Sequence, residues 1–326
     1  MALKKGICIN KGIYDKDVHP PTFMITPCNK AFNPFFIQTS KELHMKTLHK
    51  TAIALAASSL FASGVFAQAA PAAEAPEVSP VTANVTVTND YRYRGITQSN
   101  YQPAIQGGFD YAHESGLYIG NWNSSINWVS NSTNNGVKAP IEMDFYGGFK
   151  KELIAEGFAS DFGVLQYYYN QTGGNYNGMM LNPNTTELYA AQNFTFGPVT
   201  GFVKVNYALT NIFGVPNSTG SVYPDLTANY DTGIWGISLN GHIGYQYVAG
   251  QPVTSGVLLQ PQNNLSYTDF KVGATKDFGG GLSLSAAYVS TNANPNWWNT
   301  WSSSTTGVAT SSAGRPGAVV SLTKVF

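Results

Sequence analysis

Beyond position 80 the chain alternates repeatedly between apolar and polar residues, and this alternation constrains its fold more than any other feature. Within 237–247, for example, Leu239 and Ile243 occupy one row, and Asn240 and His242 occupy the other. A period of two is that of a β-strand whose two faces meet different surroundings. Most of the alternating segments have the length of about 9–11 residues that a tilted strand needs to cross a bilayer. Twelve such segments can be recognised, near 84–95, 104–113, 117–128, 141–150, 161–169, 186–196, 199–209, 225–231, 234–248, 266–278, 282–291 and 318–326.

The connections between these segments fall into two groups by length. After even-numbered segments they are tight, as at Glu114–Gly116, whereas after odd-numbered segments they are long, as at Asn170–Thr185 and Asn292–Gly317. One even-side connection, Lys151–Ser160, is longer than a turn. Short periplasmic turns and longer extracellular loops are typical of transmembrane barrels, while a β-sandwich has no reason to sort its connections in this way. The sequence therefore predicts an all-β fold, a transmembrane antiparallel up-and-down β-barrel of about twelve strands.

The composition excludes several other classes of protein. Lys+Arg and Asp+Glu both total 18, so the chain has no basic surplus for binding nucleic acid. Charged residues make up 11% of the chain and aromatic residues 13%, whereas disordered chains are rich in charge and poor in aromatics. Because only one stretch is continuously apolar, a helical membrane protein is not expected either.

The N-terminal part of the chain is interpreted as a leader rather than as part of the barrel. Residues 45–67 combine a basic start, an apolar core and a small-residue cleavage site, as in a secretory signal peptide. Residues 1–44 are interpreted as an upstream extension from a mis-called start, 68–82 as a flexible lead-in and 83–326 as the outer-membrane barrel. Both cysteines lie before position 45, so neither disulfides nor cysteine-ligated metal sites are expected beyond the leader.

The chain ends on an amphipathic strand that closes on Phe326. Val320 and Leu322 share the face of Phe326, and Lys324 interrupts this apolar row. Such an ending resembles the signal by which bacterial outer-membrane barrels are recognised for assembly. The barrel-assembly machinery is therefore an expected partner of Phe326.

Several segments of the predicted barrel carry a resemblance to a known family. Asp90–Ser99, Pro103–Tyr111 and Gly116–Trp122 resemble the corresponding parts of the TorF family of outer-membrane porins. Later, Glu142–Gly148 and Val320–Phe326 are similar to further blocks of that family. The resemblance implies an outer-membrane barrel and, less directly, pore activity, but it does not identify a solute.

Charged residues fall on the polar rows of the predicted strands and are expected to face the lumen, because a charge facing lipid costs about 2–4 kcal/mol near the midplane. Asp90, Arg92 and Arg94 share one predicted strand face. There they either attract anionic solutes or pair with Asp110 and other carboxylates and fix the barrel's shape. Such a lumen is either an aqueous pore or a space filled by paired charges. The predicted pore-lining residues are Asp90, Arg92, Arg94, Asp110, Glu142, Asp144, Lys204, His242, Asp269 and Lys271.

The aromatic residues offer no clear ligand site. Trp297, Trp298 and Trp301 crowd the last long loop, where they stack on sugars, touch lipopolysaccharide or simply pack the loop. The other aromatics are expected to face outward as lipid contacts and an interfacial girdle. This group comprises Phe109, Tyr118, Trp122, Trp128, Tyr207 and Tyr245.

Three functions are compatible with this pattern. The first is a porin-like channel for the passive diffusion of small polar solutes or ions, and the second is a non-conducting structural or adhesive barrel. A hydrolase is the third, and it would need either His242 or His113 as its base. His242 is predicted to face the lumen, and His113 is predicted to lie at a periplasmic turn. We expect a channel in the bacterial outer membrane, with no catalytic residue, metal or cofactor. Expected partners are membrane lipids, lipopolysaccharide and small polar solutes, and not nucleic acid.

Overall fold

The computed structural model describes residues 79–132, 137–173, 182–250, 253–254, 257–258, 265–301 and 309–326. The predicted upstream extension, the predicted signal peptide and most of the predicted lead-in lie outside these residues. Within the described ranges, none of the helical structure is long and apolar enough to cross a membrane.

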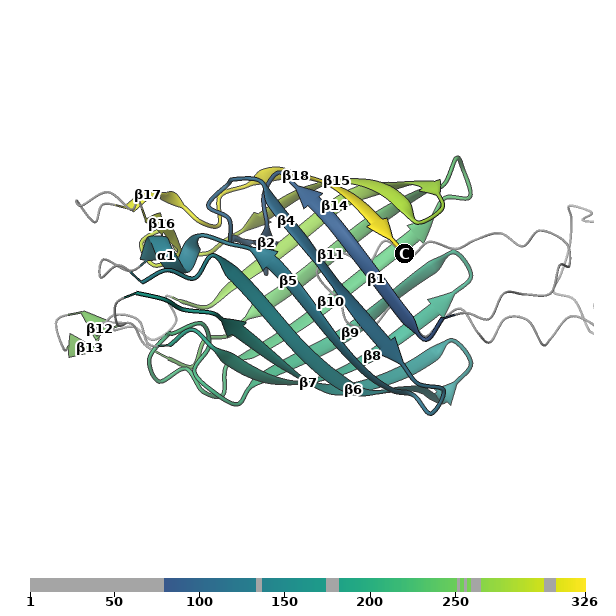
Figure 1. Ribbon diagram of the computed structural model, residues 1–326, viewed down its shortest axis with the longest axis horizontal. Helices are drawn as coiled ribbons and strands as arrows, with labels where there is room; N and C mark the ends of the chain where they lie inside the picture. The colour runs from purple at the N-terminus through teal and green to yellow at the C-terminus, as the bar shows by residue number, and fades with distance from the viewer. Residues whose placement is uncertain are drawn as a thin grey trace, which may run out of the picture. The chain divides into compact units, whose positions relative to one another are not determined.

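Twelve antiparallel strands close into a barrel, as Figure 1 shows. Wall strands that follow one another along the chain are neighbours, and β1 (Val81–Thr88) pairs with β18 (Gly317–Val325) to close the ring. The predicted fold class is therefore confirmed. The other wall strands are β4 (Ala104–Ala112), β5 (Leu117–Ser125), β6 (Ile141–Ala155), β7 (Phe158–Tyr169), β8 (Thr185–Phe196), β9 (Val199–Ala208), β10 (Val222–Asp231), β11 (Ile237–Gln246), β14 (Tyr267–Gly279) and β15 (Leu282–Thr291).

Short elements lie in the connections between wall strands. Among the described residues, three pairs of short strands form separate two-stranded sheets, and one helical turn follows β5. These elements are β2 (Arg92–Tyr93) with β3 (Ile96–Thr97), β12 (Val253–Thr254) with β13 (Val257–Leu258), β16 (Asn299–Trp301) with β17 (Ala309–Ser312), and α1 (Trp128–Ser132).

The connections are sorted between the two ends of the barrel, as predicted. Tight turns lie at one end together with the start of β1 and the chain's C-terminus (Figure 1), and we call this the turn end. All the longer connections lie at the other end, which we call the loop end. The expected exception at Lys151–Ser160 disappears, because β6 and β7 continue their pairing through Glu152 and Ala159 and turn only at 156–157.

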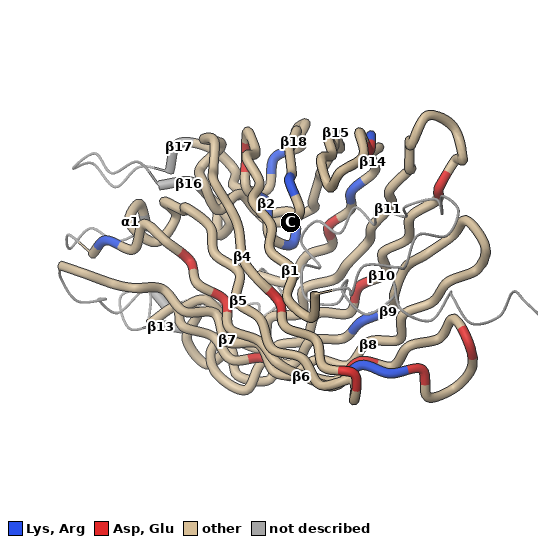
Figure 2. Tube along the Cα trace, turned by 45° about the vertical axis from the view of Figure 1, so that its right-hand side comes forward, with Lys and Arg blue, Asp and Glu red and all other residues tan. Residues whose placement is uncertain are grey.

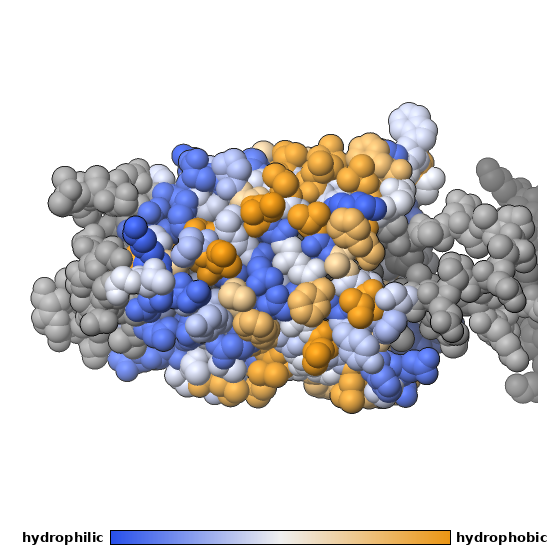
Figure 3. Space-filling model, in the orientation of Figure 1, coloured by the Kyte–Doolittle hydropathy of each residue, from blue (hydrophilic) through white to orange (hydrophobic). Residues whose placement is uncertain are grey.

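Alternation places apolar side chains outside the barrel and polar side chains inside. On β9, Val205 and Tyr207 are 42% and 47% exposed, whereas Asn206 between them is 3% exposed. On the face that Figure 3 shows, hydrophobic residues gather over the strands and hydrophilic residues dominate toward the loop end. An apolar exterior around a polar interior is the arrangement of a transmembrane barrel.

The predicted C-terminal strand closes the barrel with its apolar row outward. Val320, Leu322 and Phe326 are exposed on that outer face. Lys324, the charged interruption of the row, lies at the turn end, where its ammonium group contacts the carbonyl oxygen of Gly280. The long side chain thus carries its charge to the rim of the apolar surface, as lysines at membrane interfaces do.

Candidate functional site in the barrel lumen

The segment between β1 and β4 leaves the wall and folds into the barrel. The sequence placed Asp90, Arg92 and Arg94 on the wall of the first strand, and this placement is wrong, because β1 ends at Thr88. The three residues belong instead to the β2–β3 hairpin and its stem, which are buried. The lumen therefore contains a hairpin that the strand prediction did not foresee.

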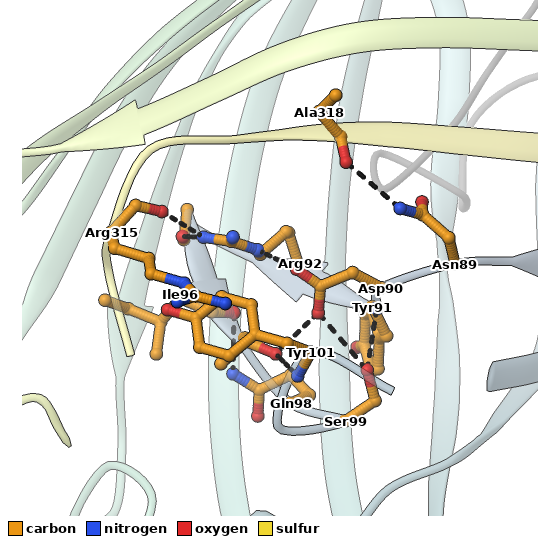
Figure 4. Close-up of polar contacts among 12 residues, drawn as sticks. Asn89, Asp90, Tyr91, Arg92, Ile96, Gln98, Ser99, Tyr101, Arg315 and Ala318 are labelled. Atoms are coloured by element: carbon orange, nitrogen blue, oxygen red, sulfur yellow. Dashed lines mark hydrogen bonds and ion pairs between the residues drawn. The ribbon is translucent and has the colours of Figure 1, made fainter. Parts of the chain in front are cut away.

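The side chain of Asn89 explains why the wall ends there. Its Nδ2 donates to the carbonyl oxygen of Ala318 (3.1 Å), and its Oδ1 accepts from the backbone N–H of Val320 (2.7 Å), as Figure 4 shows for the first of these bonds. The amide side chain replaces the next residue's backbone in the pairing with β18. Asparagine side chains compete with the backbone in this way and favour turns. The chain is thereby free to turn inward after position 89.

The tip of the hairpin is a two-residue turn formed by Arg94 and Gly95. Both have positive φ angles, 45° and 78°, which is the conformation that two-residue hairpin turns with the favoured twist require. Gly95 also lies against the wall, since a Cβ atom there would be 2.3 Å from Cγ2 of Thr291 and 2.7 Å from Cβ of Asp269. The hairpin tip therefore lies directly against β14 and β15.

Arg94 connects the hairpin to the far side of the barrel. Its Nη2 donates to Oε2 of Glu187 on β8 (2.6 Å), and its Nη1 donates to Oε1 of Gln246 on β11 (2.5 Å). The guanidinium also lies 4.2 Å from the ring centroid of Tyr223 on β10. Arginine suits this role because its planar group makes several directed contacts at once. One side chain thus joins the hairpin to three wall strands.

The stem of the hairpin is held by a second polar network, which Figure 4 shows around Asp90. Oδ1 of Asp90 accepts from the hydroxyls of Thr97 (2.6 Å) and Ser99 (3.2 Å), and Oδ2 contacts Nε of Arg92. Nearby, the hydroxyl of Tyr91 donates to Glu142 on β6 (2.6 Å). Burial, together with the charge of Glu142, raises the pKa of Tyr91 well above its usual value, so the phenol remains a donor.

Two cavities lie on either side of the hairpin, and Tyr93 lines both. The inner cavity, of about 640 Å³ including open solvent, is bounded by the hairpin and the middle of β9, β10, β11 and β14. The outer cavity, of about 760 Å³ including open solvent, is bounded by the hairpin, the loop-end connections and the adjacent strand ends. The hairpin thus contributes to the walls of both cavities.

The inner cavity has charged walls of both signs. Lys204 on β9, Asp225 on β10, and Asp269 and Lys271 on β14 line it together with Arg94. Figure 2 shows that acidic and basic positions both occur along the strands of the barrel. Two buried oxygen atoms on this wall, Oδ1 of Asp225 and Oδ1 of Asn206, have no hydrogen-bond partner among the described residues.

His242 lies on the wall of the inner cavity and contacts protein groups through both ring nitrogens. Its Nε2 lies 3.0 Å from the hydroxyl of Tyr223 and 3.0 Å from Oδ2 of Asp269, and its Nδ1 lies 2.8 Å from Oγ1 of Thr227. The residue faces the lumen, as the parity of its strand predicted. These contacts hold the imidazole of His242 against the barrel wall.

The other side of the lumen is lined by tyrosines. The hydroxyl of Tyr118 donates to Asp161 (2.6 Å) and contacts the hydroxyl of Tyr189, while Tyr146 donates to Asp110 (2.6 Å). Tyr118, Trp122 and Trp128 were expected to face outward, and this expectation is wrong, because all three pack in one cluster inside the barrel. A tyrosine suits either face, and the interior carboxylates give its hydroxyl a partner.

The structure places all ten predicted lumen residues inside the barrel, but only some of them meet. Arg92, Arg94, Lys204, His242, Asp269 and Lys271 surround the inner cavity. Glu142 and Asp110 bond to tyrosines elsewhere, and Asp144 is buried on β6. That these residues line a conducting pore stays a prediction.

Sequence reasoning missed Glu187, Asn206, Asp225 and Gln246. Each lies in a predicted strand, so the alternation of that strand contained the signal. Asn206 lies between Val205 and Tyr207, and Gln246 lies between Tyr245 and Tyr247. Alternation shows which face of a strand a residue occupies, but it does not show that Glu187 and Gln246 contact Arg94.

Several solved outer-membrane barrels have a similar fold. The COG4313 outer membrane channel from Pseudomonas putida F1 is 14% identical, with 79% of this chain and 100% of that chain covered and a TM-score of 0.45. The P. putida toluene transporter TodX is 11% identical, with 77% and 91% covered and a TM-score of 0.42. LpxR from Salmonella typhimurium is 9% identical, with 75% and 99% covered and a TM-score of 0.40. At such identities the likeness concerns the fold alone.

No curated protein matches the sequence. A family model does match, and it covers the whole barrel, from residue 72 to residue 326. The chain therefore belongs to the bacterial protein family of unknown function Gcw_chp.

Proposed function

We propose that the protein is an outer-membrane channel for the passive diffusion of small polar solutes or ions, in which the β2–β3 hairpin narrows the lumen. The observation that carries the proposal is the pair of buried oxygens, on Asp225 and Asn206, that no described protein group satisfies. Buried polar atoms in proteins nearly always bond to protein or to water. Both residues line the inner cavity, so water or a solute that enters the cavity is an available partner once these side chains turn toward it.

The way the hairpin is held also supports a channel. At its tip the contacts with the wall are made by side chains, namely those of Arg94 with Glu187 and Gln246, and of the Tyr93 hydroxyl with the Tyr167 hydroxyl (2.6 Å). These contacts are separate from the backbone hydrogen bonds that join the wall strands. The hairpin tip can therefore move without breaking the ladder of the barrel wall.

A non-conducting structural or adhesive barrel is the alternative, and the buried hairpin is the observation that favours it. If the contacts of Arg94 never open, the hairpin is a fixed plug and the inner cavity is a closed, hydrated chamber. The loops at the loop end would then carry the function.

The proposed location is the bacterial outer membrane, with the turn end toward the periplasm and the loop end outside the cell. The apolar outer surface supports contacts with lipid, and the resemblance to TorF porins supports the same location. Phe326, which is 71% exposed, is proposed to be the residue that the barrel-assembly machinery recognises. The proposal assigns no catalytic step to His242, and we expect lipid and peptide substrates to remain intact in the presence of the purified protein.

Single-channel recordings in planar bilayers test the proposal. We expect a small conductance from the wild-type protein and a larger or longer-lived one from Arg94→Ala, because the hairpin tip loses its contacts with β8 and β11. The control is Lys276→Ala, at the turn end, where the side chain contacts the carbonyl oxygen of Trp235 outside the lumen. Its conductance should equal that of the wild type. Silence of the wild type and Arg94→Ala at high protein dose, with both folded by heat-dependent gel migration, would establish the non-conducting alternative.

A further inference from the structure

The outer cavity has walls built from aromatic rings that come from separate parts of the chain. Tyr93 belongs to the hairpin, Trp128 to α1, Phe213 to the β9–β10 connection, Tyr267 to β14 and Trp298 to the β15–β18 connection. The described residues that line the cavity include no charged side chain. A wall of this composition has no charged group to bind an ion, but it provides a large contact area for a neutral aromatic ring.

The rings are fixed in place by edge-to-face contacts with one another. Tyr267 and Trp298 meet with centroids 5.1 Å apart at 73°, and Tyr93 and Phe213 meet at 5.4 Å and 74°. Such pairs are favourable beyond the area they bury. The cavity is therefore preformed, and a ligand need not order these side chains when it binds.

Several polar groups on the cavity wall already form hydrogen bonds within the protein. Nε1 of Trp298 donates to the carbonyl oxygen of Leu265 (2.9 Å), and Nε2 of Gln98 donates to that of Ile96 (3.1 Å). The amide of Gln246 accepts from Arg94 and donates to backbone carbonyls. These groups are thus committed to the protein and offer a ligand little hydrogen bonding.

Asn299, at the start of β16, differs from these residues. Its Nδ2 donates to the carbonyl oxygen of Asn296 (3.2 Å), but its Oδ1 is buried and has no partner among the described residues. A buried acceptor left without a donor costs about 1–3 kcal/mol. Asn299 lines the outer cavity, and a rotation of its side chain would turn Oδ1 toward a donor on a ligand held there.

We propose that the outer cavity binds a small neutral aromatic molecule that carries a hydrogen-bond donor, as in a phenol, and that the donor bonds to Oδ1 of Asn299. The volume that compares with known protein cavities is about 150 Å³, and an apolar cavity of about that size can hold benzene. A sugar is the competing occupant, because aromatic rings also stack on sugars. Its many hydroxyl groups would meet amide and indole groups that are already bonded, and each hydroxyl buried without a partner would weaken binding.

Such a molecule would be a substrate of the proposed channel. Its passage through the barrel rests on the proposed function, whereas its binding does not. Binding itself is measured on the full-length protein in detergent, with no conductance involved. A protein that conducts without binding phenol, and one that binds phenol without conducting, are therefore distinguishable results.

Calorimetric titration of the purified protein with phenol, toluene and glucose tests the site, with empty detergent micelles as the reference. Toluene has nearly the shape of phenol but lacks the donor. The informative variant is Asn299→Leu, which removes the acceptor at similar size, and its matched control is Asn296→Ala, an exposed residue of the same loop. Heat-dependent gel migration confirms that each variant is folded.

We expect phenol to bind the wild type and the Asn296→Ala variant alike. In Asn299→Leu the ratio of phenol affinity to toluene affinity should fall by about 2–10-fold, the equivalent of one hydrogen bond. Ala313→Leu, which fills part of the cavity and leaves Asn299 in place, should weaken both ligands together. Glucose binding tighter than phenol, an absence of phenol binding, or an unchanged phenol-to-toluene ratio in a folded Asn299→Leu variant would each overturn the proposal.

Discussion

Nη2 of Arg94 and Oε2 of Glu187 lie 2.6 Å apart inside the barrel, and both side chains are at most 5% exposed. Arg94 belongs to the connection between β1 and β4, and β8 lies nearly opposite that connection in the strand order of the ring. This ion pair therefore spans the lumen. Asn206 donates a further hydrogen bond to the same carboxylate oxygen (2.8 Å), so the pair is part of a network on the far wall.

Removing one partner of this pair should destabilise the protein strongly. Arg94→Ala leaves the Glu187 carboxylate buried without its cation, and losing one partner of a buried pair costs about 3–5 kcal/mol. The double variant Arg94→Ala/Glu187→Gln should recover much of the loss, because no isolated charge remains. Urea unfolding in lipid vesicles measures both free energies, and a loss below about 1 kcal/mol for Arg94→Ala would show that the pair is solvated.

Gly95 should tolerate alanine less well than a glycine of similar backbone conformation in a turn. Gly233 has a φ of 67° and nothing within 4 Å of a Cβ, whereas Gly95 has a φ of 78° and Thr291 at 2.3 Å. Gly233→Ala should cost about 1–2 kcal/mol, from the left-handed conformation alone. Gly95→Ala should cost about 1–3 kcal/mol more, from overpacking. Equal losses in thermal unfolding would mean that the hairpin tip does not rest on the wall.

The outer face of the barrel should reject charge in a depth-dependent way. Ile243 on β11 is 53% exposed on the outer face, so Ile243→Arg would place a guanidinium in lipid at a cost of about 2–4 kcal/mol near the midplane. Ile234 is equally apolar but lies in the turn before β11, and Ile234→Arg should cost at most about 1 kcal/mol. Folding titrations into vesicles compare the two, and similar small costs would contradict a lipid-facing outer surface.

Ion preference should follow the lysines of the inner cavity. Lys204 and Lys271 both line it, so replacing both with glutamate changes the local charge by four units of the same sign. Reversal potentials in asymmetric KCl should shift toward cation selectivity in this double variant, because fixed lumen charges set the selectivity of such pores. Lys276→Glu is the control, since it lies on the same strand at the turn end. A shift of equal size in the control would place the selectivity filter outside the inner cavity.

The strands and their two faces were predictable because their signal is local. A strand such as β9 or β11 alternates wherever it lies in the ring, and tight turns such as Gly197–Pro198 are recognisable in any setting. The ambiguous cases were residues that suit both faces. Tyr118 was assigned to lipid because its ring is apolar, but in the barrel its hydroxyl bonds to Asp161, 43 positions away in the chain.

The hairpin marks what the sequence alone did not determine. Residues 90–94 alternate as a wall strand does, so their pattern is the same whether the segment continues β1 or folds into the lumen. The choice depends on partners that are remote in the chain, because Arg94 bonds to Glu187 and Gln246, 93 and 152 positions away. Alternation thus determined the barrel, because the contrast between an apolar outer face and a polar inner face is a property of each strand by itself. Only the closed ring, which brings distant strands around one lumen, decided what lies inside it.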